Sequence, residues 1–209
     1  MLALGSMCEI GDQLHPDGTL DKAAYDLIGN VYTQVEKKEA WCKGAKTLSD
    51  IAVFTPEAFD VLERNMSLAL EGATRILEES AQQFDVVDQH SDYSQYKVII
   101  LPDEIPVDAT LAKKLNSFVK KGGALIASFA SGMNLERDAF TLFALGVSLT
   151  KGDAVEMRGK IFERGDYCEY LRPKELLGDG IVDTEYVMYT KGMPVKTSKA
   201  KVLAEGYSS

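Results

Sequence analysis

Residues 96–132 constrain the fold of this chain more than any other segment, because they contain a strand–helix–strand pattern. The letters YKVIIL followed by Pro102 are typical of a buried strand that ends at a proline. Asp108 is placed to cap a helix, and Gly122 and Gly123 to end it, since glycine tolerates the left-handed C-cap conformation. The run ALIASF then predicts the next buried strand. Strands that alternate with helices indicate a parallel α/β sheet with right-handed crossovers, flanked by helices.

The segments on either side extend this pattern. Residues 51–54 (IAVF) and 84–87 (FDVV) predict two further strands. Residues 56–80 between them predict a helix with a break near Asn65, whose second half has the clearer apolar stripe. Beyond Gly146 the helical periodicity fades, and residues 154–171 and 181–190 predict shorter strands and turns. We therefore expect one α/β domain over residues 48–209.

Residues 1–47 differ from the rest. Cys8–Ile10 predicts the end of a short strand, and the following segment to Gly18 is polar and contains a proline and an Asp-Gly turn signal. Asp21 is a plausible N-cap for a helix that runs to about Lys38 with apolar residues at helical spacing. One helix cannot bury its apolar stripe alone, so it must pack on the next domain, on another copy, or on a domain outside this sequence.

Charge argues against a nucleic-acid partner. The net charge is −9, whereas nucleic-acid binding needs clustered cations that displace counterions. The dense basic cluster, Lys113, Lys114, Lys120 and Lys121, is interpreted as the solvated face of an amphipathic helix. No apolar run approaches the roughly 18 residues of a membrane span.

The cysteines indicate a reducing, cytoplasmic location. Cys8, Cys42 and Cys168 are odd in number and widely spaced, and no C-x-x-C is present, so neither a zinc site nor a disulfide framework is predicted. The N-terminus has no basic region followed by a full apolar region, so we do not interpret it as a signal peptide.

The sequence contains none of the catalytic or cofactor-binding motifs that a parallel α/β enzyme would carry. No glycine-rich phosphate or dinucleotide motif follows any predicted strand, so no cofactor is expected. The turn at residues 128–132 (SFASG) is where a parallel α/β enzyme would place its nucleophile; it holds no cysteine, and no G-x-S-x-G surrounds Ser131. A small-molecule pocket at the strand ends would use Asp103 and Glu104, whose simpler role is to form the turn before the helix that begins at Asp108.

One N-terminal loop concentrates polar residues. Asp12, Gln13 and His15 follow the predicted strand end, where the enzymes built on a (β/α)8 barrel keep substrate contacts. The alternative is that these are turn residues that satisfy backbone groups. Glycoside hydrolysis needs two carboxylates at a fixed separation, and this loop does not supply that pair.

Two blocks together resemble a family. CEIGDQLHPD with AAYDLIGNVYTQVEKKEAW is similar to the last strand, loop and helix of the barrel in bacterial glycoside hydrolases of the alpha-L-fucosidase-like kind, related in layout to family 42 beta-galactosidases. LALEGATRILEESAQQFDVVD with YKVIILPDEIPVDATLAKKLNSFVKKGGALIASFASG resembles the beta-galactosidase trimerisation domain that follows that barrel. That domain has a flavodoxin-like, class I glutamine amidotransferase-like fold and generally lacks the amidotransferase nucleophile.

The resemblance implies a division of the chain at residue 47. Residues 1–47 would be the C-terminal remnant of a glycoside hydrolase barrel and its linker, with Asp12, Gln13 and His15 lining the sugar site of an intact barrel. Residues 48–209 would be a non-catalytic assembly domain that self-associates, with a trimer as the form that the resemblance implies, in a protein of carbohydrate metabolism. The alternatives left open are a stand-alone amidotransferase-like enzyme or binding domain, and residual glycosidase activity.

Overall fold

The computed structural model describes residues 6–59, 67–149, 154–157, 160–163, 167–198 and 200–208, and the chain divides into two compact units, Met1–Leu48 and Ser49–Ser209. Within these described ranges, no helix has both the length and the apolar character needed to cross a membrane.

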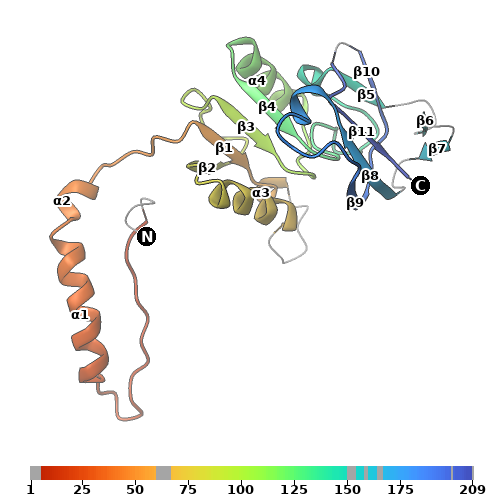
Figure 1. Cartoon of the computed structure of the whole chain (residues 1–209). Helices are drawn as coiled ribbons and strands as arrows, with labels where there is room; N and C mark the ends of the chain where they lie inside the picture. The colour runs from red at the N-terminus through yellow and green to blue at the C-terminus, as the bar shows by residue number, and fades with distance from the viewer. Residues whose placement is uncertain are drawn as a thin grey trace. The chain divides into compact units, whose positions relative to one another are not determined.

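The second unit is built on a four-stranded sheet, as Figure 1 shows. The strand order is β2-β1-β3-β4, and every neighbouring pair is parallel. The predicted α/β class and the predicted strands are therefore confirmed. Their bounds are β1 (Ile51–Phe54), β2 (Phe84–Val87), β3 (Val98–Leu101) and β4 (Ala124–Ala127).

Helix α4 (Ala109–Lys120) begins and ends where the sequence predicts. The Asp108 carboxylate accepts a hydrogen bond from the backbone N–H of Leu111 at 2.7 Å, which satisfies one free donor of the first turn. At the other end Gly122 adopts a φ of +102°, the left-handed region that favours glycine.

The second half of the helix predicted over residues 56–80 is confirmed, whereas residues 57–59 form a 3-10 turn and the break predicted near Asn65 lies outside the described residues. A short 3-10 turn, η2 (Glu57–Phe59), follows β1, residues 60–66 lie outside the described residues, and α3 covers only Leu68–Glu79. The start of α3 has a local cause, because the Ser67 hydroxyl accepts a hydrogen bond from the N–H of Leu70 and so caps the helix.

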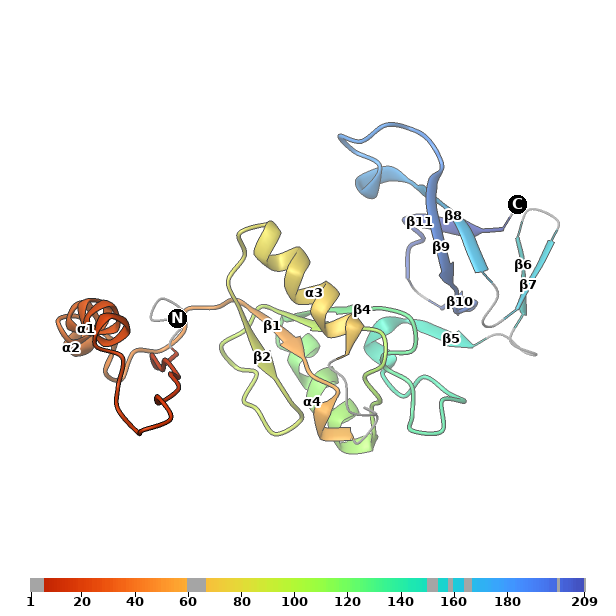
Figure 2. The same ribbon diagram turned by 90° about the horizontal axis from the view of Figure 1, so that it is seen from below.

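Successive side chains along each strand point to opposite faces of the sheet, so they contribute to two separate hydrophobic cores. Figures 1 and 2 show α4 and α3 on opposite faces of the sheet. The core beneath α4 is the larger and includes Phe54, Ile99, Leu101, Leu111 and Leu115. The core beneath α3 is formed by Val53, Leu70 and Leu77.

The rest of the second unit consists of short antiparallel pairs, β10 with β5, β6 with β7, and the sheet β11-β8-β9. The shorter strands and turns predicted in residues 154–171 and 181–190 are confirmed for the described residues, with β9 preceded by an irregular bend at residues 181–185. The bounds are η3 (Phe143–Leu145), β5 (Val147–Leu149), β6 (Ala154–Met157), β7 (Lys160–Glu163), β8 (Tyr167–Pro173), η5 (Glu175–Leu177), β9 (Tyr186–Lys191), β10 (Val195–Thr197) and β11 (Ala204–Tyr207).

The first unit contains α1 (Lys22–Glu36) and α2 (Glu39–Cys42), and the predicted helix is confirmed with Asp21 as its N-cap. The strand end predicted at Cys8–Ile10 is wrong, because residues 6–14 are irregular and pair with no strand among the residues that the structure describes. This segment is instead tied to α1, since the Tyr32 hydroxyl donates to the Cys8 carbonyl at 3.0 Å.

Helix α1 has no buried residue, and the apolar side chains of Leu27 and Val31 are 69% and 43% exposed. A helix of this length depends on tertiary packing for most of its stability.

We therefore expect trypsin to cut at the exposed Lys43 and Lys46 well before it cuts within residues 49–209, with the products identified by mass spectrometry. Initial cleavage inside the four-stranded sheet would contradict this view of the first unit.

Candidate functional site

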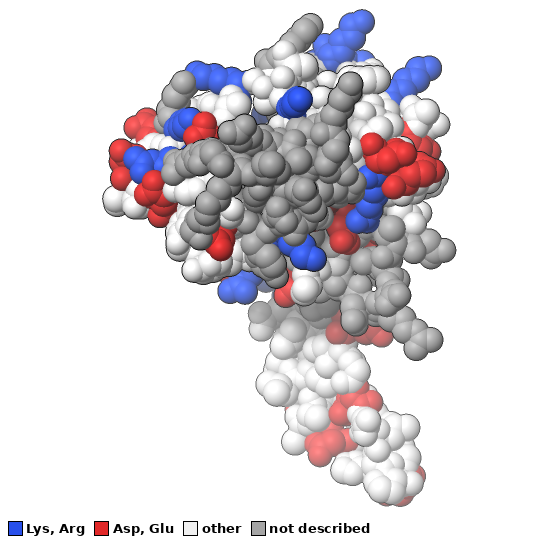
Figure 3. Space-filling model, turned by 90° about the vertical axis from the view of Figure 1, so that its right-hand side faces the viewer, with Lys and Arg blue, Asp and Glu red and all other residues white. Residues whose placement is uncertain are grey.

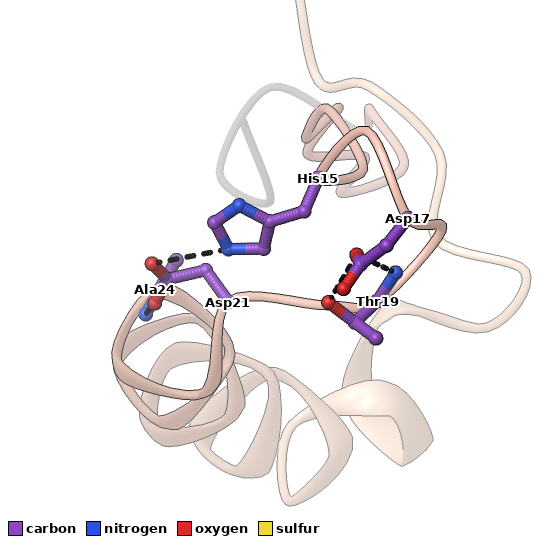
Figure 4. Close-up of polar contacts among 5 residues, drawn as sticks. All are labelled: His15, Asp17, Thr19, Asp21 and Ala24. Carbon is purple, nitrogen blue, oxygen red and sulfur yellow. Dashed lines mark hydrogen bonds and ion pairs between the residues drawn. The ribbon is translucent and has the colours of Figure 1, made fainter.

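The polar N-terminal loop closes as a turn between His15 and Thr19 (Figure 4). The Thr19 carbonyl accepts from the His15 N–H at 3.0 Å, and the His15 carbonyl accepts from the Gly18 N–H at 2.8 Å. The Asp17 carboxylate accepts from the Thr19 hydroxyl at 2.7 Å and from its N–H at 3.0 Å. Both bonds favour the ionised form, and they lower the pKa of Asp17 below its ordinary value.

The predicted substrate contacts take different positions around this turn. His15 Nε2 lies 3.8 Å from Asp21 Oδ2, the same carboxyl group that caps α1 by accepting from the Ala24 N–H at 2.9 Å. Asp12 and Gln13 are exposed and lie in the irregular segment before the turn. The structure thus places His15 beside the cap of α1. No group of three or more metal-binding side chains occurs among the described residues.

The carboxyl ends of β3 and β4 are the second place where the sequence allowed for a site. Here Ser131 is 1% exposed, and its Oγ accepts from the Ile105 N–H at 3.1 Å. Ser128 Oγ likewise accepts from the Asp103 N–H at 2.9 Å. Both hydroxyls join the loop after β3 to the loop after β4, and neither has a histidine or carboxylate partner among the described residues.

Phe129 occupies the strained position of this turn. Its φ of +46° places a large side chain in the left-handed region, two residues after β4 ends. In a nucleophile elbow the reactive residue takes such a sharp, strained turn. An aromatic side chain there can neither attack a substrate nor transfer a proton, so the enzyme hypothesis centred on Ser131 is not favoured.

A groove of about 700 Å³ that the sequence did not indicate lies beside β8. Its central cation, Arg172, pairs with Asp183 at 2.6 Å and Glu185 at 3.2 Å. Nearby, Lys174 pairs with Glu205 at 2.5 Å. The described side chains on the face drawn in Figure 3 likewise mix both signs of charge. The residues that line the groove are Arg172, Pro173, Lys174, Leu176, Gly178, Asp179 and Asp183.

Comparison with known proteins identifies the sheet domain. Residues 75–152, which include β2, β3, α4, β4 and η3, match the family model described as the beta-galactosidase trimerisation domain. The chain carries a beta-galactosidase trimerisation domain. This match supports the domain identity that the resemblance predicted for this region.

Relatives of the trimerisation domain are beta-galactosidases. Beta-galactosidase Pbg of Clostridium perfringens is 28% identical over 137 residues, which are 54% of this chain and 19% of that protein. Beta-galactosidase BgaP of Planococcus sp. is 43% identical over 60 residues, which are 29% of this chain and 9% of that protein. The chain therefore spans less than a fifth of the length of these relatives.

Solved structures with the same fold cover nearly the whole chain. Alpha-L-fucosidase isoenzyme 2 from Paenibacillus thiaminolyticus is 37% identical with a TM-score of 0.78, over 98% of this chain and 30% of that one. A beta-galactosidase from Rahnella sp. R3 is 17% identical with a TM-score of 0.67, over 92% of this chain and 30% of that one. The second likeness is one of fold alone.

Proposed function

We propose that this chain is the assembly part of a bacterial glycoside hydrolase of the beta-galactosidase or alpha-L-fucosidase-like kind, and that its trimerisation domain holds copies of the protein together. The match of residues 75–152 to a domain named for trimerisation carries the proposal. The strained position of the turn after β4 holds Phe129, whose side chain is not reactive, and this supports a role without catalysis. A cytoplasmic location is part of the proposal and rests on three cysteines that are all free thiols.

The finer fold assignment belongs to this proposal as well. We infer a flavodoxin-like, amidotransferase-like domain, because flavodoxin-like sheets have the order 2-1-3-4-5 and the observed order β2-β1-β3-β4 agrees with its first four strands. A crystal structure in which a further strand enters this sheet antiparallel or between β1 and β3 would overturn the assignment.

We also propose that residues 1–47 are the end of a catalytic barrel, in which Asp12, Gln13 and His15 face the sugar. The exposed apolar side chains of α1 support this proposal, because a barrel would supply the missing packing surface. In a longer form that contains the barrel, a bound-sugar structure is expected to place at least one of the three side chains within hydrogen-bond distance of the sugar. All three pointing away from it would refute the idea.

The 209-residue chain itself is expected to show no turnover of chromogenic α-fucosides or β-galactosides. Retaining and inverting glycosidases need a pair of carboxyl groups across the scissile bond, which requires an enclosed sugar site. The loop at Asp12 is exposed and cannot supply such a site alone. Turnover by the purified chain that disappears in Glu9→Gln or Asp12→Asn variants would contradict a non-catalytic role.

A further inference from the structure

The outer surface of α4 and the adjoining turn η3 carries an aromatic side chain in an unusual setting. Phe143 is 85% exposed, although Leu142 before it is fully buried and Leu145 after it packs against the core beneath α4. The two leucines fix the turn and leave Phe143 directed outward. A rigid aromatic residue presented in this way loses little conformational entropy when it binds a partner.

Two lysines of α4 share a helix face with Asn116, the residue that holds this turn. Asn116 Oδ1 accepts from the Ala144 N–H at 3.0 Å, which holds η3 against the middle of α4. Lys113 and Lys120 lie three residues before and four residues after Asn116, so they share its face of the helix. Both are exposed, and within the described part of the chain no carboxylate pairs with either. We call Lys113, Asn116, Lys120 and Phe143 the Phe143 patch.

The other two lysines of this region, Lys114 in α4 and the C-cap residue Lys121, already face groups inside the domain. Lys114 Nζ donates to the Gln89 and Ser91 carbonyls and lies 4.0 Å from the centre of the Tyr93 ring. Lys121 is close enough to Asp92 to help lower the pKa of that carboxyl, after the larger effect of its hydrogen bonds from Ser94. The positive charge left for a partner therefore comes from the Phe143 patch.

We propose that the Phe143 patch is a contact between copies of this chain, docking onto an acidic surface of the next copy; this inference rests on the proposed function. The whole patch lies within residues 75–152, the part that matches the trimerisation domain. The chain has a net charge of −9, and α4 carries lysines without a carboxylate, so the remaining surface of another copy is more negative still. Opposite charges favour this encounter over a contact between two identical basic patches.

Ring symmetry agrees with such a pairing. A cyclic trimer cannot be built from a patch that meets itself, because its contacts join two different surfaces of neighbouring copies. A basic, aromatic surface on one copy and an acidic surface on the next meet this requirement. Exposed aromatic residues that become buried at the centre of a contact are typical hot spots.

The test compares Phe143→Ser with Leu176→Ser in the complete 209-residue chain. Leu176 is a matched control, since it also lies in a 3-10 turn and is 77% exposed, but it falls outside residues 75–152. We expect Phe143→Ser to weaken self-association by about 10-fold or more, measured by sedimentation equilibrium, and Leu176→Ser to leave it unchanged. Thermal unfolding of both variants checks that each is folded.

A second pair of variants tests the charges. The double change Lys113→Glu with Lys120→Glu is expected to weaken association and to reduce its dependence on salt, because screening acts on exposed charge pairs. Lys37→Glu with Lys38→Glu makes the same change in net charge at two lysines of the first unit, outside residues 75–152, and is expected to have little effect.

The possible results separate this inference from the function on which it rests. Association that all four variants retain equally would overturn the Phe143 patch and leave the assembly function standing. Loss of association in Leu176→Ser but not in Phe143→Ser would likewise overturn it, since the contact would then lie near β8 and β9. A wild-type chain that is monomeric at every concentration would overturn both.

Discussion

Replacing Phe54 with alanine is expected to lower the free energy of unfolding of the sheet domain by about 3–5 kcal/mol, the usual cost of emptying a buried aromatic site. Phe54 is fully buried in the central strand β1. Its ring centre lies 6.2 Å from that of Phe59 and 6.1 Å from that of Tyr93. The substitution thus opens a cavity beneath α4 where three aromatic rings meet.

Urea denaturation followed by circular dichroism measures this loss. Val86→Ala is the control, because Val86 is also an apolar strand residue but lies on the edge strand β2 and is 52% exposed. It should cost less than about 1 kcal/mol, since little buried surface is removed. Equal losses for the two variants would show that the core beneath α4 does not dominate the stability of the domain.

Gly132→Ala is the second change with a large expected effect, a destabilisation of about 2–4 kcal/mol from backbone strain and overpacking together. Gly132 has a φ of +93°, and a Cβ there would lie 2.7 Å from Leu145 Cδ1 and 3.4 Å from Leu142 Cβ. The backbone cannot move away easily, because the Gly132 N–H donates to the Ile105 carbonyl and its own carbonyl accepts from the Thr141 N–H.

Gly72→Ala provides the opposite control. Gly72 lies within α3, and a Cβ there would meet nothing within 4 Å. Alanine is favoured over glycine in a helix, so this change should stabilise the domain by about 0.5–1 kcal/mol. Chemical denaturation of both variants gives the comparison, and a neutral Gly132→Ala would mean that the turn after β4 can relax.

The sheet was predictable because its strands and α4 carry local signals. Asp108 and Gly122 mark the ends of α4 in the sequence, and short apolar runs mark β1 and β3. Local signals and the final fold agree there, as expected where no conflicting tertiary demand acts. In the helix predicted over residues 56–80, the Ser67 cap fixes where the second half begins.

The turn after β4 shows what a sequence pattern does not contain. Ser131 looked like the polar member of a possible elbow, whereas the strained residue is Phe129 and Ser131 is buried against the Ile105 N–H. Both features depend on hydrogen bonds between two loops about 26 residues apart. The same holds for the groove at Arg172, whose carboxylate partners follow it by more than ten residues.

The sequence pattern also could not predict that the Phe143 side chain points outward. Phe140 to Gly146 is an apolar run in which Leu142 and Leu145 enter the core and Phe143 does not. Only the packing of η3 against Asn116 decides which of these side chains is left for a partner.

Sedimentation equilibrium of the complete chain over a wide range of concentrations tests the assembly function most directly. We predict a mass that rises with concentration towards three times that of the monomer. We also expect added salt to shift this association to higher concentration, because exposed charges contribute to the contact. A mass that stays at the monomer value at every concentration and salt level would contradict the assembly function proposed for the trimerisation domain.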